Sequence, residues 1–280
     1  MDRSRMSLMT FPMGMDLIRK RLTVKDTLYL ARQANIPNVD VMNVGNRQLE
    51  QYLLAIKETG VSVYTYIKGI SFLGSPHRRD CTIRKSLDTA CKLQAKYLMI
   101  VPYLLFDQGR AQRMGKAAVK NRMIEGFRSA VEMARDSGVR VCFEITPHDA
   151  SCLSGITDCM DILNAVPGLE FVFDTANMLP HGDEPIKAYE VFKGRISHVH
   201  LKDVVLEESA KPSKYAEHAL DGRTMKCVPW GKGIIPVHNI YERMISDGYQ
   251  GQFAIEYVHP GVKNCALTDH IKQLDSFLKE

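Results

Sequence analysis

The segment Leu169–Asp183, LEFVFDTANMLPHGD, contains an apolar run that ends in a carboxylate. Phe171, Val172 and Phe173 are typical of a buried strand. Asp174 follows at once, and it shares a face with Val172 because side chains alternate between the two faces of a strand. A turn alone would explain one such ending, since Asp and Asn favour turns. The same ending recurs on three further strands, which points to a fold that gathers strand ends.

Short β-rich runs alternate with longer amphipathic stretches along the whole chain. The expected strands are residues 7–13, 38–42, 61–67, 96–103, 139–145, 169–175, 196–203 and 252–258. Parallel neighbouring strands need a crossover helix, so this alternation predicts a parallel sheet. An open doubly wound sheet is the main rival, but eight regular units without a GxGxxG motif after the first strand favour a closed barrel. We predict a single-domain (β/α)8 TIM barrel over residues 1–280, with a long loop at about 204–235 between strands seven and eight.

Composition excludes several classes of protein. With 45% hydrophobic and 25% charged residues, the chain of 280 residues can build a large core. The net charge is +5, but Lys and Arg are spread along the chain beside 32 acidic residues, so we expect no nucleic-acid partner. The seven cysteines show no CxxC spacing, and no apolar run is long enough to span a membrane. We therefore expect a cytoplasmic protein without membrane attachment, and homo-oligomerisation is left open.

Three other expected strands also carry a polar residue near the carboxyl end, opposite their bulky apolar residues. These residues are Glu144 in VCFEI, His200 in HVHL and Glu256 in FAIEY. In a barrel the polar face is the interior, and the carboxyl-terminal rim carries the active site. Three carboxylates near one axis would repel one another, and a divalent cation removes that repulsion. The set suits Mn²⁺, Mg²⁺, Co²⁺ or Zn²⁺. The alternative is a hydrogen-bonded polar plug. His198, two residues before His200, is expected either to pack deeper or to orient a ligand.

These motifs resemble the xylose-isomerase-like TIM barrel superfamily, and within it the sugar and sugar-phosphate isomerases and epimerases. The resemblance covers nearly the whole chain and is carried, in order, by CFEI, FDTAN, HVHLKD, WGKG, GYQG and AIEY. The Asp-x-x-Asn form and HLKD look most like ketopentose-phosphate 3-epimerases, alongside enzymes of the tagatose and psicose 3-epimerase type. Two departures leave the substrate open: some members carry His in place of Asn177, and several carry Arg shortly after the metal His, where this chain has KDVVLEE.

The resemblance also implies roles for individual residues. It implies one divalent metal ion with four ligands, which are Glu144, Asp174, His200 and Glu256. It gives the acid and base roles to Glu144 and Glu256. It suggests three substrate contacts, which are Asn177, Lys202 and His148.

The expected function is that of a divalent-metal-dependent isomerase or epimerase of a carbohydrate. Polarising a sugar carbonyl acidifies the adjacent C–H, so one Glu can remove that proton to give a cis-enediolate and another can return one. Return on the opposite face inverts the carbon, and return on the same face moves the carbonyl; the sequence leaves both open. The alternatives are an inosose-type dehydratase on the same scaffold, a metal-dependent abasic-site endonuclease and a non-catalytic sugar-binding protein. The endonuclease needs further His ligands from strands two to four, which contain none.

Basic residues near the expected rim favour a phosphorylated ketopentose or ketohexose over the free sugar. Lys202 shares a strand face with His200, and the segment 204–235 adds Lys211, Lys214, Arg223, Lys226 and Lys232. Arg78, Arg79 and Arg84 follow the third expected strand. A bound phosphate would supply binding energy that positions the reacting carbons.

Overall fold

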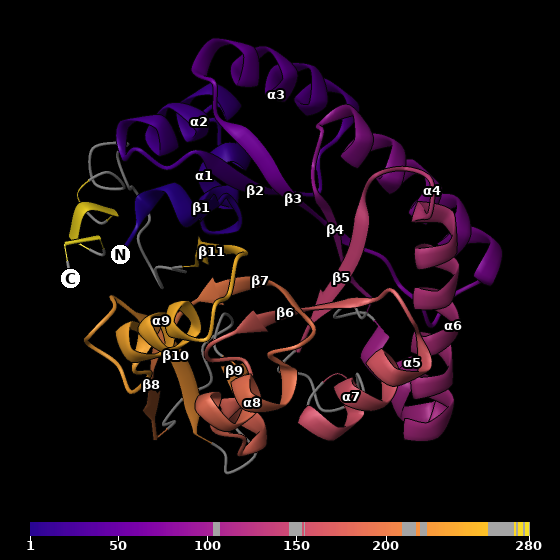
Figure 1. Ribbon diagram of the computed structural model, residues 1–280. Helices are drawn as coiled ribbons and strands as arrows, with labels where there is room; N and C mark the ends of the chain where they lie inside the picture. Colours follow the sequence, from indigo (N-terminus) through magenta and orange to yellow (C-terminus); the bar gives the residue numbers. More distant parts are fainter. Residues whose placement is uncertain are drawn as a thin grey trace.

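Eight parallel strands close into a barrel in the order β1-β11-β7-β6-β5-β4-β3-β2, and helices surround them (Figure 1). This computed structural model describes residues 1–102, 107–145, 153, 155–208, 217–218, 223–256, 272, 274–276 and 278–279. The chain order runs round the ring, except that β11 follows three strands which lie outside the barrel. The predicted (β/α)8 barrel is confirmed.

Each barrel strand overlaps one of the expected runs. The strands are β1 (Met6–Met9), β2 (Asn38–Met42), β3 (Ser62–Gly69), β4 (Tyr97–Val101), β5 (Arg140–Glu144), β6 (Glu170–Asp174), β7 (Ile196–Leu201) and β11 (Gln252–Ile255). The first strand is shorter than the expected 7–13, because a 3-10 helix, η2 (Phe11–Met13), begins two residues after it. Pro12 lacks a backbone N–H and so favours this turn over a continued strand.

The helices begin and end at recognisable signals. Their bounds are α1 (Gly14–Ile18), α2 (Val24–Gln33), α3 (Asn46–Thr59), α4 (Pro76–Lys92), α5 (Gln108–Met114), α6 (Lys116–Ala134), α7 (Ile156–Ala165), α8 (Pro185–Phe192) and α9 (Val237–Ser246). Thr23 and Asp26 form the expected capping box at the start of α2. α3 ends at Gly60, whose φ of 73° suits a residue without a Cβ atom.

The two faces of the strands pack into different layers. Phe143 on β5 contacts Phe127 of α6 with ring centroids 4.8 Å apart, and Phe171 on β6 stacks on Phe192 of α8 at 3.9 Å. These aromatic rings fix the outer face against the helices. Val172, on the opposite face, belongs to a separate buried cluster inside the barrel, together with Met9, Tyr64, Ile67, Tyr97, Met99 and Cys142. The alternation therefore directs the polar strand ends into the barrel mouth.

The segment expected as a long loop at about 204–235 contains regular structure. β8 (Asp203–Glu207), β10 (Thr224–Val228) and β9 (Glu217–His218) form an antiparallel sheet in that order. Asp203 ties this sheet to the WGKG segment, because its carboxylate accepts from the backbone N–H groups of Gly233 and Ile235 at 2.9 and 3.0 Å. A Cβ atom on Gly233 would lie 2.1 Å from Asp203 Oδ1, so only glycine fits there.

In the part of the chain that the structure describes, no helix combines the length and the apolar character needed to cross a membrane.

Candidate metal centre

The carboxyl ends of four adjacent strands, β5, β6, β7 and β11, gather the four residues that the sequence singled out. One ligand atom from each lies within 4.8 Å of the others; the residues are Glu144, Asp174, His200 and Glu256. Asp174 and His200 are direct partners in the register of β6 and β7. Asp174, His200 and Glu256 are buried, whereas the Glu144 side chain keeps 15% of its surface exposed.

The inward-facing atoms of this cluster lack hydrogen bonds. His200 Nδ1 lies 3.0 Å from Glu144 Oε2 and 3.3 Å from Glu256 Oε2, but these contacts are not aligned as hydrogen bonds. Among the described residues, no partner hydrogen-bonds to Glu144 Oε2, Glu256 Oε2, Asp174 Oδ2 or either nitrogen of His200. A buried polar group left unpaired costs about 1–3 kcal/mol, so the unbonded oxygens of Glu144 and Glu256 beside one nitrogen of His200 fit a bound cation.

The contacts of Asp174 explain why a carboxylate follows the apolar strand β6. Its Oδ1 accepts from the backbone N–H of Ala176 at 2.7 Å and of Asn177 at 3.0 Å. These bonds form the turn that Asp favours, and they hold the carboxylate so that Oδ2 faces the cluster. One side chain therefore forms the turn and presents its other oxygen to the cluster.

Lys202 lies against the ligands instead of projecting to the surface. The residue is buried, and Nζ lies 2.9 Å from both Asp174 Oδ2 and Glu256 Oε1. Nζ also donates to Asn177 Oδ1 at 3.0 Å, and Asn177 Nδ2 donates to the carbonyl oxygen of Ile145 at 3.2 Å. The structure thus brings Asn177 and Lys202 to the edge of the cluster. His148 lies outside the described residues.

The charges in the cluster shift the pKa values of its members. Burial raises the pKa of Asp174 to about 7, although Lys202 lowers it, and Glu256 and Glu144 add to the rise. Burial also acts to raise the pKa of Glu256, but Lys202 and His200 outweigh it and lower that pKa. The pKa of His200 lies well above its usual value: burial opposes this rise, and the neighbouring Glu144 and Glu256 carboxylates outweigh burial. A cation entering this site would therefore compete with protons.

One residue next to the site escaped the sequence reasoning. Asp40 in the middle of β2 is buried and lies 2.6 Å from His198 Nε2. The available signal was a carboxylate inside the apolar run NVDVM, which stands before the strand end and so did not fit the pattern of the other four. His198 and His200 are both fully buried.

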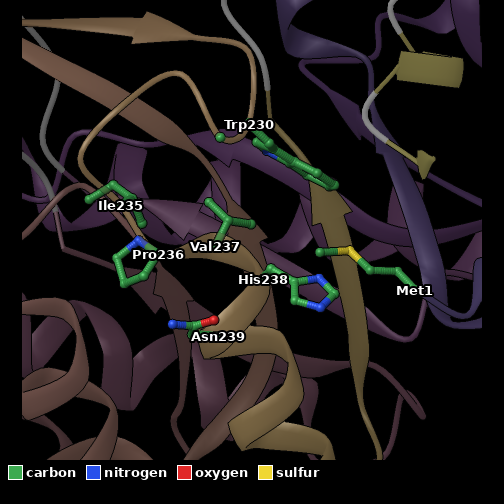
Figure 2. Close-up of a pocket in the computed structure, with 8 residues that line it drawn as sticks. Met1, Trp230, Ile235, Pro236, Val237, His238 and Asn239 are labelled. Carbon is green, nitrogen blue, oxygen red and sulfur yellow. The ribbon is translucent and has the colours of Figure 1, made fainter. Parts of the chain in front are cut away.

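A separate pocket of about 160 Å³ lies beside Trp230 at the start of α9 (Figure 2). Its lining is Met1, Trp230, Gly231, Ile235, Pro236, Val237, His238 and Asn239, and it includes no member of the metal cluster. Trp230 Nε1 donates to the carbonyl oxygen of Leu201 at 3.3 Å, one residue after His200. Trp230 therefore contacts both this pocket and the strand that carries His200, but none of the four clustered residues lines the pocket.

Comparison with known proteins agrees with this geometry. Residues 28–279 match the family described as Xylose isomerase-like TIM barrel. The chain belongs to this family.

Members of the Xylose isomerase-like TIM barrel family include both dehydratases and epimerases. Inosose dehydratase 1 of Bacillus cereus is 26% identical over 140 residues, which are 49% of this chain and 46% of that protein. The chain thus matches about half the length of this curated relative. The structure of the IOLI protein with a bound zinc atom has a TM-score of 0.76 at 14% identity and covers 98% of this chain and 96% of that one. D-psicose 3-epimerase, solved in the presence of D-fructose, has a TM-score of 0.73 at 14% identity, with coverages of 98% and 97%. At these identities the structures show a shared fold.

Proposed function

We propose that this chain is a divalent-metal-dependent isomerase or epimerase of a sugar or sugar phosphate, which moves a proton at a carbon next to a carbonyl. The observation that carries the proposal is the cluster of inward-facing carboxylate and imidazole atoms that make no hydrogen bonds. Asp174 and His200, both buried, would hold the ion, together with one oxygen from Glu144 and one from Glu256. Three carboxylates and one imidazole suit Mn²⁺, Mg²⁺, Co²⁺ or Zn²⁺.

When bound, a divalent cation would act as a Lewis acid that polarises the substrate carbonyl and acidifies the adjacent C–H. The protein residues then supply the proton transfer. Glu256 is suited to be the base, because Lys202 at 2.9 Å and His200 favour its ionised form. Glu144 stands three strands away in the barrel order and is the more exposed of the two, so it would take a proton from solvent and donate it to the sugar from another direction, while Glu256 keeps the proton that it removed.

Asn177 and Lys202 would orient the substrate. Both lie at the edge of the cluster, and their mutual hydrogen bond of 3.0 Å fixes the direction of the Lys202 ammonium group. An ammonium held among carboxylates is suited to a sugar hydroxyl group, whereas a phosphate would have to approach Asp174 and Glu256 as well. A phosphorylated ketose is therefore best bound with its phosphate away from Lys202, toward the rim. Of the basic residues suggested for this role, Arg79 is buried and paired with Asp80, and Lys211 and Lys214 lie outside the described residues. Arg78, Arg84 and Lys232 are exposed and would be the phosphate contacts.

A second candidate is dehydration of an inosose-type ketone, and two observations favour it. The curated relative that matches half of this chain is named an inosose dehydratase. Lys202 Nζ is also a third proton-bearing group beside the two glutamates. In this reaction a glutamate would accept the proton from the carbon next to the carbonyl. The C–O bond at the next carbon would break, and the departing hydroxyl would take a proton from Lys202 to leave as water.

One experiment separates these functions. Protein loaded with Mn²⁺ is incubated in D₂O with free ketoses, phosphorylated ketoses and an inosose, and products are identified by NMR and mass spectrometry. An epimerase or isomerase gives a product of the same composition with deuterium next to the carbonyl, and a dehydratase gives a product that has lost one water. Turnover without solvent deuterium would indicate hydride transfer between carbons and contradict the acid–base roles. Glu144→Gln and Glu256→Gln should each stop turnover, and neither change should prevent folding.

A further inference from the structure

A second polar group lies inside the barrel, next to the metal cluster. His198 on β7 and Asp40 on β2 are both fully buried, and His198 Nε2 lies 2.6 Å from Asp40 Oδ2. Ser7 on β1 donates to the other oxygen, Asp40 Oδ1, at 2.8 Å. His198 Nδ1 lies 3.1 Å from the carbonyl oxygen of Gln252, its register partner on β11. Four strands therefore hold this pair in one orientation.

The hydrogen bonds of this pair leave the Asp40 carboxylate able to accept a further hydrogen bond. The Gln252 carbonyl can only accept, so His198 Nδ1 is the donor in that contact, and Nε2 is within hydrogen-bond distance of Asp40 Oδ2. Both nitrogens of His198 are then occupied. The carboxylate of Asp40 has about four acceptor positions and uses only some of them on Ser7 and His198, so it can accept from a further donor.

His200 is the group that needs such an acceptor. Its ring stands edge-on to the His198 ring, with centroids 5.3 Å apart and an interplanar angle of 89°. One nitrogen of His200 lies within 4.8 Å of a ligand atom of Asp40 and of His198. Nδ1 faces Glu144 and Glu256, so Nε2 is the nitrogen left for another partner. A histidine that binds a metal through one nitrogen almost always donates the N–H of the other to a carboxylate, a carbonyl or a water.

We propose that Asp40, fixed by Ser7 and His198, accepts the Nε2–H of His200 directly or through one water, and so directs the Nδ1 lone pair at the metal. Asp40 and His198 are then positioning residues for the metal centre, and neither touches the substrate. A span of up to 4.8 Å is within the reach of a single bridging water. The inference rests on the proposed metal site and assigns a purpose to a buried carboxylate that the four-ligand set does not use.

The test measures metal binding and the histidine tautomer, independently of activity. Protein labelled with ¹⁵N at histidine is loaded with Zn²⁺, and long-range ¹H–¹⁵N spectra assign the state of His200. We expect Nδ1 bound to zinc and Nε2 protonated. Asp40→Asn keeps the shape of the side chain but removes its charge, and we expect a loss of about 10- to 100-fold in Zn²⁺ affinity, measured by chelator competition. Thr65→Val is the matched control, because Thr65 on β3 is the register partner of Asp40 and its buried hydroxyl makes no hydrogen bond to a described residue, and it should leave Zn²⁺ affinity unchanged.

Each result decides the inference. A folded Asp40→Asn protein with unchanged Zn²⁺ affinity would overturn it, because a purely structural Asp40 would alter the melting temperature of the metal-free protein alone. Zinc on Nε2 of His200 in the wild type would overturn it even if Asp40→Asn failed to fold. Two zinc ions per chain would also overturn it, since Asp40 would then be a ligand. If the wild type bound no divalent ion, the proposed metal site would fail together with the inference.

Discussion

Asp174 divides its two oxygen atoms between a turn and a ligand site, and this division can be tested at the scale of one residue. Asp174→Asn keeps an acceptor for the backbone N–H groups of Ala176 and Asn177 but removes the charge that faces the cluster. We expect a folded protein whose bound divalent ion falls from stoichiometric to undetectable after dialysis, measured by elemental analysis. Glu190→Gln removes an exposed carboxylate paired with Lys193 and serves as the control. Full metal retention in Asp174→Asn would remove Asp174 from the ligand set.

The raised pKa of the same carboxyl predicts a pH dependence of metal binding. Burial raises the pKa of Asp174 to about 7 in the metal-free protein, so below that pH the carboxyl holds a proton that an entering ion must displace. The affinity for Mn²⁺ should therefore fall as the pH drops from about 8 to about 6, and the raised pKa of His200 adds a second proton that the ion must displace. Isothermal titration calorimetry in buffers of different ionisation enthalpy measures both the affinity and the protons released. An affinity that stays constant over this interval, with no proton release, would contradict the prediction.

The small sheet of β8, β9 and β10 follows Lys202 in the chain, and its attachment to the WGKG segment depends on one glycine. A Cβ atom at Gly233 would lie 2.1 Å from Asp203 Oδ1 and 2.3 Å from the carbonyl oxygen of Val204. Gly233→Ala must therefore displace the Asp203 carboxylate, which follows Lys202 directly. We expect a loss of about 1–3 kcal/mol in the free energy of unfolding, measured by urea denaturation.

The control for this change is Gly194→Ala, since a Cβ atom there meets nothing within 4 Å. Equal stability of the two alanine variants would show that the WGKG segment can move away from Asp203 without cost.

At the scale of the whole molecule, a bound ion would connect four adjacent strands of the eight-stranded barrel. An ion that binds only the folded state stabilises it by about 2.7 kcal/mol when its concentration is 100 times its dissociation constant. The melting temperature should therefore rise with Mn²⁺ and fall back on chelation, measured by differential scanning calorimetry. His200→Ala should show no rise, and a rise that persisted in this variant would place the stabilising ion elsewhere.

The sequence was sufficient to predict the barrel and the four residues of the cluster. Both depend on the alternation of apolar and polar side chains, which repeats from strand to strand. Phe171 and Phe173 face the helices and Asp174 faces the barrel mouth, as the alternation required. Asp40 was missed because its role depends on the distance across the barrel to His198, and no local pattern encodes that distance. The sheet of β8, β9 and β10 was missed because its short strands lack the apolar periodicity of the barrel strands.

The position of Lys202 has a consequence for the order in which the protein is assembled. Its ammonium group lies 2.9 Å from Asp174 and from Glu256, so two of the three clustered carboxylates already have a counter-charge made by the chain itself. Under the proposed metal dependence, the barrel would therefore fold before a metal ion binds, and metal loading would be a later step. Protein made in metal-depleted medium should be recovered as a native barrel that is ready to load, and the supply of the ion in the cell would then set how much of it is active.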